Sequence, residues 1–416
     1  MRSGFKVFDA DAHVIYPADL WPRFLEKKYQ GRVVRRPPAG FDHYQPTMID
    51  GRYNQHPTNL YGNFQKAIGW TTEDMIAQYG DLMRNGFSGD RVARALAVEG
   101  VDAMVIYGPE YDMWLEGMDP ELQAALCRAY NRWGQEMYET SGQRVVVSGP
   151  VAIGDVNRAV EEIQYAYEHL GVRCFWARPD FLNHRNLGDR YYDPVWEILQ
   201  DLDCAFGTHE FQGLNAATAG SDRYTTFTEW HVVVHPMEGM HAVVSMICNG
   251  VFERFPRLRC AYMEAGCGWL PSWLHRIDEN LELAGDQEFP ELTMSATEYF
   301  QRNCWISTEC EDRFVADVIR WLGDNHIVYE TDFPHPDSKY PYATDHFLAL
   351  RPDLISDDSK RKILWNNAMD LYRFPEGYLA AEDSYTEGTA KPLAEARHWK
   401  MATRRAHDGE DAAHSG

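Results

Sequence analysis

Residues 144–177 read RVVVSGPVAIGDVNRAVEEIQYAYEHLGVRCFWA, and this stretch contains one strand–helix–strand unit. Its two ends, 144–153 and 172–177, are short apolar runs rich in β-branched and aromatic residues, a composition typical of buried strands. Between them, residues 155–170 carry apolar side chains three or four positions apart, and Gly171 follows as a helix stop. The stretch therefore predicts one unit of an α/β fold.

The same order recurs along most of the chain. Apolar runs predict six further strands, at 5–9, 102–107, 204–208, 258–263, 304–307 and 327–331. Amphipathic stretches separate these runs, among them 194–202 and 313–322, the second closed by Gly323. Eight strands that each lead into a helix are the count of a (β/α)₈ TIM barrel, and we predict that architecture.

The spacing of the predicted strands is uneven in two places. Long insertions follow the first and fifth strands, at 14–90 and 210–235. Both leave from strand C-terminal ends, where barrel enzymes build their active-site walls, so we expect a lid or pocket wall. Surface decoration or an oligomer contact is the alternative. We assign 1–375 to the barrel and 376–416 to a C-terminal extension, whose polar end at 401–416 is expected to be disordered.

Composition narrows the classes of partner. The chain has 416 residues and a net charge of −23, and such an acidic balance argues against nucleic-acid or anionic-membrane partners. No run approaches the roughly 18 apolar residues of a membrane span, and the N-terminus lacks a secretory apolar region. The eight cysteines are scattered without a CxxC pair, which predicts reduced core thiols and a cytoplasmic location. A homodimer is the commonest default assembly.

Ionisable residues stand at the C-terminal ends of several predicted strands. Asp11 and His13 are two positions apart, so in an extended segment both side chains leave the same face. His209 ends the fifth strand, Glu264 the sixth and Asp332 the eighth. Imidazoles and carboxylates together form a ligand set suited to zinc, manganese or iron(II). Each residue alone has an ordinary structural explanation, and the prediction of a metal site depends on their joint placement.

Four segments carry a resemblance to a known family. They are DADAH (9–13), GVFERFPRLRCAYMEAGCGWLPSWLHRID (250–278), YETDFPHPD (329–337) and NNAMDLY (366–372). The sequence resembles the amidohydrolase-related (amidohydrolase 2) family, relatives of aminocarboxymuconate-semialdehyde decarboxylase and the hydroxybenzoate decarboxylases, over roughly residues 5–375. The resemblance implies that Asp11, His13, His209 and Asp332 bind the metal.

The sequence departs from that family at the end of the sixth strand. Well-studied members carry a histidine there, used as a proton donor or to orient water, whereas this chain has Glu264. Glu264 is a catalytic candidate as a general base, a metal ligand, or a partner that orients His209 or His241. A buried carboxylate paired with an arginine or the backbone is the structural alternative.

Other candidates have weaker support. His241, on a helix entered at Pro236, is a second catalytic candidate if it turns toward the pocket. Arg178 could clamp a substrate carboxylate, and Trp176 and Phe211 could line the pocket. Salt bridges or core packing explain these residue types equally well. The same applies to further residues near the active end, namely Glu110, Glu309, Trp114 and Trp230, and His335 is expected to brace its loop.

These residues predict an enzyme with one divalent metal ion, zinc before manganese or iron(II). Asp332 is expected to hold or accept the proton of a metal-bound water. Through the resemblance, the substrate is expected to be a small aromatic or cyclic carboxylate or carbonyl compound, and the reaction hydrolysis or non-oxidative decarboxylation. The rival hypothesis is a catalytically silent barrel that binds a small molecule.

Overall fold

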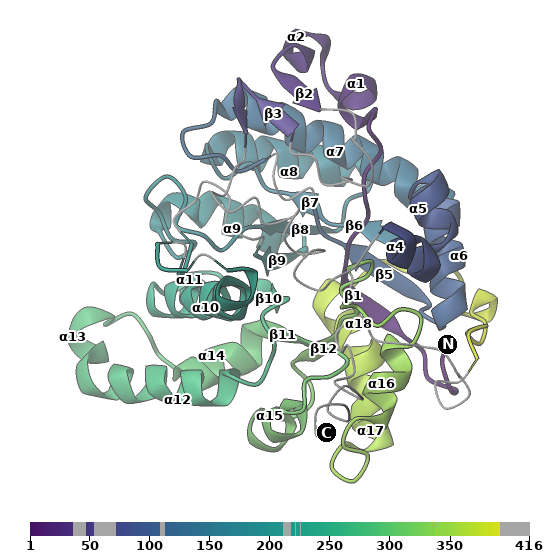
Figure 1. Ribbon diagram of the computed structural model, residues 1–416. Coiled ribbons are helices and arrows are strands. Elements are labelled where there is room, and N and C mark those ends of the chain that lie inside the picture. Colours follow the sequence, from purple (N-terminus) through teal and green to yellow (C-terminus); the bar gives the residue numbers. More distant parts are fainter. Residues whose placement is uncertain are drawn as a thin grey trace, which may run out of the picture.

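The computed structural model describes residues 1–35, 47–53, 72–108, 113–210, 218–220, 222–224, 226–335 and 337–391. Parallel strands occupy its centre, and helices surround them (Figure 1). The central strands are β1 (Phe8–Ala12), β5 (Ala103–Ile106), β6 (Val145–Val147), β7 (Gly149–Pro150), β8 (Cys174–Ala177), β9 (Ala205–His209), β10 (Arg259–Met263), β11 (Cys304–Thr308) and β12 (Ile327–Tyr329).

These strands form two parallel groups, in the orders β1-β5-β6 and β12-β11-β10-β9-β8-β7. The two groups of strands lie next to each other at both of their edges. At one edge only Ser148 separates β6 from β7. At the other edge the N–H of Asp332, just beyond β12, donates to the carbonyl oxygen of Asp11 in β1 at 3.2 Å. With β6 and β7 taken as one interrupted strand, the strands correspond one to one with the predicted ones. The predicted α/β barrel class is confirmed.

Helices follow the strands and cover the outside of the barrel (Figure 1). They are α6 (Gly89–Glu99), α7 (Pro120–Thr140), α8 (Val156–Leu170), α9 (Asp193–Asp201), α10 (Phe227–Cys248), α11 (Val251–Arg254), α12 (Leu270–Asn280), α14 (Ala296–Asn303), α15 (Val315–Leu322) and α18 (Asn367–Tyr372). Helix α8 shows why they form where they do. Asp155 caps its first turn by accepting from Arg158 N–H at 3.0 Å, and Gly171 ends it in the left-handed region at φ 70°.

Shorter elements complete the described chain. A small antiparallel sheet, β2-β3-β4, lies in the region predicted as the first insertion. Its strands and the remaining helices are β2 (Val33–Arg35), β3 (Thr47–Ile49), β4 (Arg52–Tyr53), α1 (Leu20–Phe24), α2 (Lys27–Gln30), α4 (Thr72–Tyr79), α5 (Asp81–Asn85), η1 (Arg190–Tyr192), η2 (Leu281–Gly285), α13 (Asp286–Glu288), α16 (Ala343–Ala349), α17 (Asp357–Arg361), η3 (Lys362–Asn366) and η4 (Glu382–Ser384).

Two element boundaries differ from the predictions in ways that matter for function. Strand β1 lies at Phe8–Ala12 and not at 5–9, so it includes two buried aspartates that a hydrophobic pattern does not assign to a strand. Helix α10 begins at Phe227, well before Pro236, which lies inside the helix. The Thr226 side chain caps it by accepting from Glu229 N–H at 3.3 Å. The helix therefore extends through the end of the predicted second insertion.

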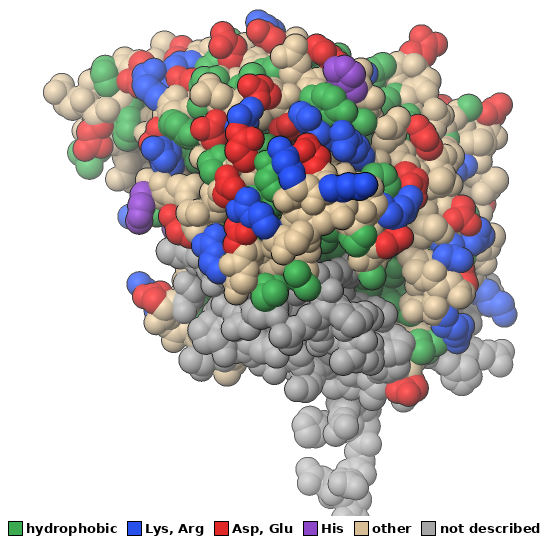
Figure 2. All heavy atoms as spheres, turned by 90° about the horizontal axis from the view of Figure 1, so that it is seen from above, with side chains coloured by type: hydrophobic (Ala, Val, Ile, Leu, Met, Phe, Trp, Pro, Cys, Tyr) green, Lys and Arg blue, Asp and Glu red, His purple; other side chains and the backbone are tan. Residues whose placement is uncertain are grey.

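The surface and thiols agree with the composition. Acidic and basic side chains are interspersed over the described part of the face shown in Figure 2. All eight cysteines lie in described segments, are buried, and take part in no disulfide. Within the described residues, no helix combines the length and the apolar character needed to cross a membrane.

The end of the barrel opposite the strand C-termini offers a stability test. Asn367, in the NNAMDLY segment, is buried and donates to Asp324 O at 2.7 Å and Ile327 O at 2.6 Å. Asn367→Ala leaves both carbonyls without this donor, so we expect unfolding free energy to fall by ~1–3 kcal/mol. Urea denaturation measures the change. Asn366→Ala, at the exposed neighbouring position, is the matched control, and equal losses in both variants would contradict the assignment.

Candidate metal centre

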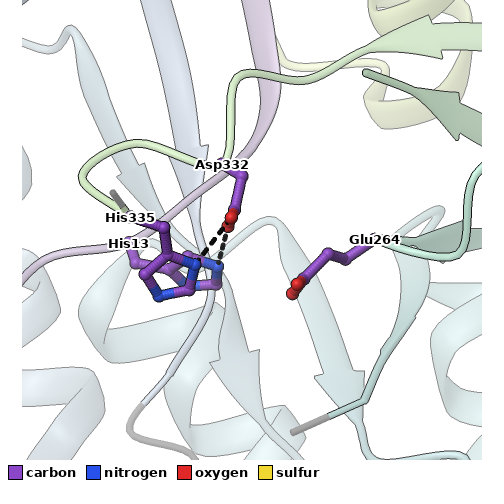
Figure 3. Close-up of side chains that lie close together, drawn as sticks. All are labelled: His13, Glu264, Asp332 and His335. Carbon is purple, nitrogen blue, oxygen red and sulfur yellow. Dashed lines mark hydrogen bonds and ion pairs between the residues drawn. The ribbon is translucent and has the colours of Figure 1, made fainter. Parts of the chain in front are cut away.

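Four strands deliver ionisable side chains to one point. Asp11 lies in β1 with His13 just beyond it, and His209 is the last residue of β9. Met263, the last residue of β10, pairs with His209, so Glu264 emerges beside it. Asp332 follows β12. Because parallel strands end at one face of the barrel, these side chains meet there, and Figure 3 shows Glu264 pointing toward His13, Asp332 and His335.

The side chains approach each other through possible metal ligands. His209 Nε2 lies 3.1 Å from Asp11 Oδ2 and 3.0 Å from Glu264 Oε2. His13 Nε2 lies 3.0 Å from Asp332 Oδ1 and 3.9 Å from Asp11 Oδ1. One ligand atom from each of Asp11, His13 and His209 fits within 4.8 Å of the others, as in a second group of His13, Glu264, Asp332 and His335.

Burying several carboxylates at one point costs free energy, because their charges lose the contact with water. Neither carboxylate oxygen of Asp11 receives a hydrogen bond from the described part of the chain, although the residue is only 1% exposed. Burial, with the charge of Asp332, raises the pKa of Asp11 well above its usual value despite nearby His13. Burial and the charges of Asp332 and Asp11 likewise raise the pKa of Glu264. A cation among these oxygens would offset the cost of burying their charges.

The tautomer of His13 also favours a cation. Its Nδ1 lies 3.2 Å from the Tyr107 carbonyl oxygen, which can only accept, so Nδ1 carries the proton. In the neutral ring, Nε2 then directs its lone pair toward Asp332 Oδ1. An imidazole oriented by a backbone carbonyl through its other nitrogen is the usual arrangement of a metal-binding histidine. The residues present therefore fit a divalent metal with mixed nitrogen and oxygen ligands.

Asp332 and His335 form a short ion pair. His335 Nδ1 lies 2.6 Å from Asp332 Oδ2, and its ring stacks on His13 with centroids 4.6 Å apart. Burial opposes the ionisation of Asp332, but the charges and hydrogen bonds of His335 and His13 outweigh it and hold the pKa of Asp332 well below its usual range. His335 thus does more than brace its loop, because it holds one oxygen of Asp332 while the other faces His13.

An unusual backbone conformation directs the side chains of two of these carboxylates toward the centre. Glu264 has φ 46° and Asp332 has φ 55°, in the left-handed region that residues other than glycine seldom adopt. Hydrogen bonds maintain both turns, since Glu264 N–H donates to Glu330 Oε2 at 3.2 Å and Asp332 N–H donates to Asp11 O. Non-glycine residues held in this conformation at a shared site point to a functional constraint.

Sequence comparison now identifies the family. The family model described as amidohydrolase matches residues 8–374. The chain belongs to this amidohydrolase family. The matched region spans every residue of the candidate centre, from Asp11 to His335.

Individual relatives have low sequence identity to this chain, and the two solved structures share its fold. The 2-amino-3-carboxymuconate-6-semialdehyde decarboxylase of Dictyostelium discoideum is 26% identical over 262 residues, covering 62% of this chain and 70% of the relative. An amidohydrolase structure from Mycobacterium avium subsp. paratuberculosis K-10 aligns with TM-score 0.69 and 22% identity, covering 90% of this chain and 99% of that one. A dihydroxybenzoic acid decarboxylase structure from Polaromonas sp. JS666, with bound manganese and the inhibitor 2-nitroresorcinol, aligns with TM-score 0.60 and 18% identity, covering 90% and 97%.

Not every predicted site residue of this amidohydrolase reaches the centre. His241 is 55% exposed, lies 3.7 Å from Glu238 through Nδ1, and lines a surface cavity together with Glu238 and Trp273. Arg178 is buried between Asp180 Oδ2, at 2.6 Å from Nε, and Glu210 Oε1, at 2.9 Å from Nη2. Its guanidinium is thus already engaged by two carboxylates of the protein.

The other predicted pocket residues, aromatic and acidic, lie in different parts of the structure. Trp176 is fully buried, its ring against Trp114 with centroids 4.6 Å apart and 6.3 Å from that of His209, so it supports the histidine from the core. Trp230 packs in a small separate cluster with Val234. Burial raises the pKa of Glu309 to about 8. Phe211 and Glu110 lie outside the described residues.

Three residues near the centre were missed at the sequence level. His235 and His231 lie on α10, and His235 Nε2 is 3.6 Å from Glu264 Oε1. Their spacing of four residues in HVVVH was the available signal, but it depends on a helix that extends N-terminal to Pro236. Asp9 lies two residues before Asp11 in β1 and is fully buried, and its place in the DADAH motif was the available signal, although the strand pairing is irregular between Asp9 and Ala12.

Asp9 helps to position the candidate metal centre through hydrogen bonds to Thr331. Thr331 donates to it twice, through the backbone N–H at 2.9 Å to Oδ1 and through the hydroxyl to Oδ2. Thr331 directly precedes Asp332, so these bonds hold the end of the eighth barrel strand against β1. The support acts through position and not through contact with the centre.

Removal of this support should weaken metal binding. Thr331→Val deletes the hydroxyl bond to Asp9 while preserving shape, and we expect a ~10–100-fold loss of Mn²⁺ affinity, the range for residues that orient ligands. Equilibrium dialysis measures it. Thr208→Val is the matched control, since Thr208 is buried directly before His209 but its hydroxyl makes only a 3.4 Å contact with Ala261 O. Unchanged affinity in Thr331→Val would refute the role.

Proposed function

We propose that this amidohydrolase is a divalent-metal-dependent, non-oxidative decarboxylase of a small aromatic or related unsaturated carboxylate. The convergence of two imidazoles and three carboxylates at the C-terminal face of the barrel carries the proposal of a metal enzyme. The reaction class is supported by the relatives, which include decarboxylases of a carboxymuconate semialdehyde and of dihydroxybenzoic acid.

Asp11, His13, His209 and Asp332 would hold the metal, because His13 lies 3.0 Å from Asp332 and 3.9 Å from Asp11, and His209 lies 3.1 Å from Asp11. The ion would act as a Lewis acid toward oxygen atoms of the substrate. Manganese, bound in the Polaromonas relative, is as suitable as the zinc favoured from sequence, since carboxylates and imidazoles accept both.

In decarboxylation the bond between the ring carbon and the carboxyl carbon breaks, and its electron pair remains on the ring carbon. Carbon dioxide leaves, and the ring carbon takes up one proton. We assign that proton to His335 of the Asp332–His335 pair, because the pKa of Asp332 lies well below its usual range and its carboxylate accepts from His335 across the 2.6 Å contact. His335 is 19% exposed through its side chain, which provides a route for proton exchange with solvent.

Hydrolysis is the second candidate, and Glu264 is the observation that favours it. Glu264 stands where well-studied members have histidine, and its Oε2 lies 3.0 Å from His209 Nε2. A carboxylate there could accept a proton from an attacking water, with Asp332 sharing that task. An activated ester, a lactone or a carbon–carbon bond next to a carbonyl would then be the substrate.

Assembly, location and domain limits remain proposals drawn from the sequence. We retain a homodimer, a cytoplasmic location, a barrel at 1–375 and an extension at 376–416. The described part of the extension supports a close association with the barrel, since Thr389 N–H donates to Ala97 O at 3.2 Å and Ala390 N–H to Val98 O at 2.8 Å.

Two histidines on the same side of the centre test the assignment of ligands. His13→Ala removes a proposed ligand and should abolish tight Mn²⁺ binding. His335→Ala should leave most binding intact but lower kcat by ~10²–10⁴-fold, the contribution of a positioned acid. Metal analysis after dialysis and steady-state kinetics separate the two effects. Equal metal losses in the two variants would contradict this division of roles.

The product distinguishes the two reactions. We expect the Mn²⁺-loaded protein to release carbon dioxide from members of a hydroxybenzoate and carboxymuconate panel, with one solvent deuteron incorporated at the former carboxyl position in D₂O. Mass spectrometry and NMR detect both products. Turnover of lactones or esters without carbon dioxide release would select hydrolysis, and a protein that binds no transition metal would exclude both reactions.

A further inference from the structure

Glu264 faces two different sets of imidazoles. Its Oε2 lies 3.0 Å from His209 Nε2, on the side of the proposed ion. Its other oxygen, Oε1, lies 3.6 Å from His235 Nε2, on the side of helix α10. A carboxylate that turns its two oxygens toward separate nitrogen ligands has the arrangement of a bridge between two cations.

Helix α10 supplies the ligands on the second side. His231 and His235 are four residues apart, so their side chains lie on one helical face, the spacing by which helical histidine pairs bind zinc. Their rings are edge to face with centroids 4.9 Å apart. One ligand atom from each of His231, His235 and Glu264 lies within 4.8 Å of the others.

The burial of His235, without hydrogen bonds to its ring from the described residues, indicates a ligand. The residue is 6% exposed, and neither ring nitrogen has a hydrogen-bond partner among the described residues. A buried imidazole gains from a partner at its ring nitrogens, and a cation held between His235 and Glu264, which lie 3.6 Å apart, would supply one. Burial lowers the pKa of His231 and, further, that of His235, while the charge of Asp332 opposes this effect and adds negative potential on this side.

The helix is held firmly where these histidines lie. Trp230 and Val234 are buried in a small cluster of their own, packed with Tyr224 and Phe227. Because they alternate with the histidines along the helix, this packing fixes the face that His231 and His235 present to Glu264. A ligand pair on a rigid helix is preorganised for binding.

We propose that His231, His235 and Glu264 form a second divalent-cation site, and that Glu264 bridges it to the ion held by Asp11, His13, His209 and Asp332. The proposed function needs only the first ion, so this inference goes beyond it. A bridging Glu264 is no longer a free general base, and two cations can bind two oxygen atoms of one substrate.

Metal stoichiometry tests the second site. After removal of metals by chelation, the full chain is titrated with Mn²⁺, and bound metal is measured by equilibrium dialysis with elemental analysis. We expect two equivalents in the unchanged protein and one in the double variant His231→Ala/His235→Ala. His241→Ala, an exposed histidine farther along the same helix, is the matched control and should keep two.

Electron paramagnetic resonance of the Mn²⁺-loaded, unchanged protein gives a second readout that does not depend on the folding of a variant. A carboxylate bridge should produce a spin-coupled signal at saturation. One equivalent at saturation with an uncoupled signal would overturn the second site while leaving the proposed function standing. Two equivalents retained in the double variant would also overturn it, and no bound metal at all would overturn both proposals.

Discussion

The cost of burying several carboxylates at one point governs the active end of this protein. Asp11, Glu264 and Asp332 meet at the ends of three parallel strands, and none of their ion-pair partners in the described chain is an arginine or a lysine. Within the described chain the basic groups that approach them are imidazoles, and His13, whose Nδ1 faces the Tyr107 carbonyl oxygen, can offer its Nε2 lone pair to a cation. Such a set is stable when a cation neutralises it, so the same interaction that would allow catalysis also stabilises the barrel mouth.

The barrel provides the precision that this constraint requires. Strand register aligns Met263 with His209 and thereby places Glu264 beside the histidine. Asp9 accepts a hydrogen bond from Thr331 and so fixes the position of the residue that directly precedes Asp332. The left-handed turns at Glu264 and Asp332 then direct carboxylates that would otherwise follow the strand pleat. Each support lies outside the centre, and each acts on the position of a charged group.

Glu264 is the residue on which the proposed reactions differ. Its approach to His209 is compatible with hydrolysis, while the relatives point to decarboxylation. The histidines of α10 offer a third role, in which the carboxylate is shared between two cations.

The sequence by itself determined the repeating βα order, the family, and the strand-end placement of Asp11, His13, His209 and Asp332, because periodicity and local motifs carry that information. It did not reveal His231 and His235, because Pro236 suggested a helix start where the tertiary packing of Trp230 and Val234 maintains a continuous helix. It also left Arg178 available to a substrate, whereas the structure engages it with Asp180, two residues along the chain, and with Glu210, which follows another strand. Which charged groups face each other across strands and helices depends on long-range register, and only the tertiary structure decides that.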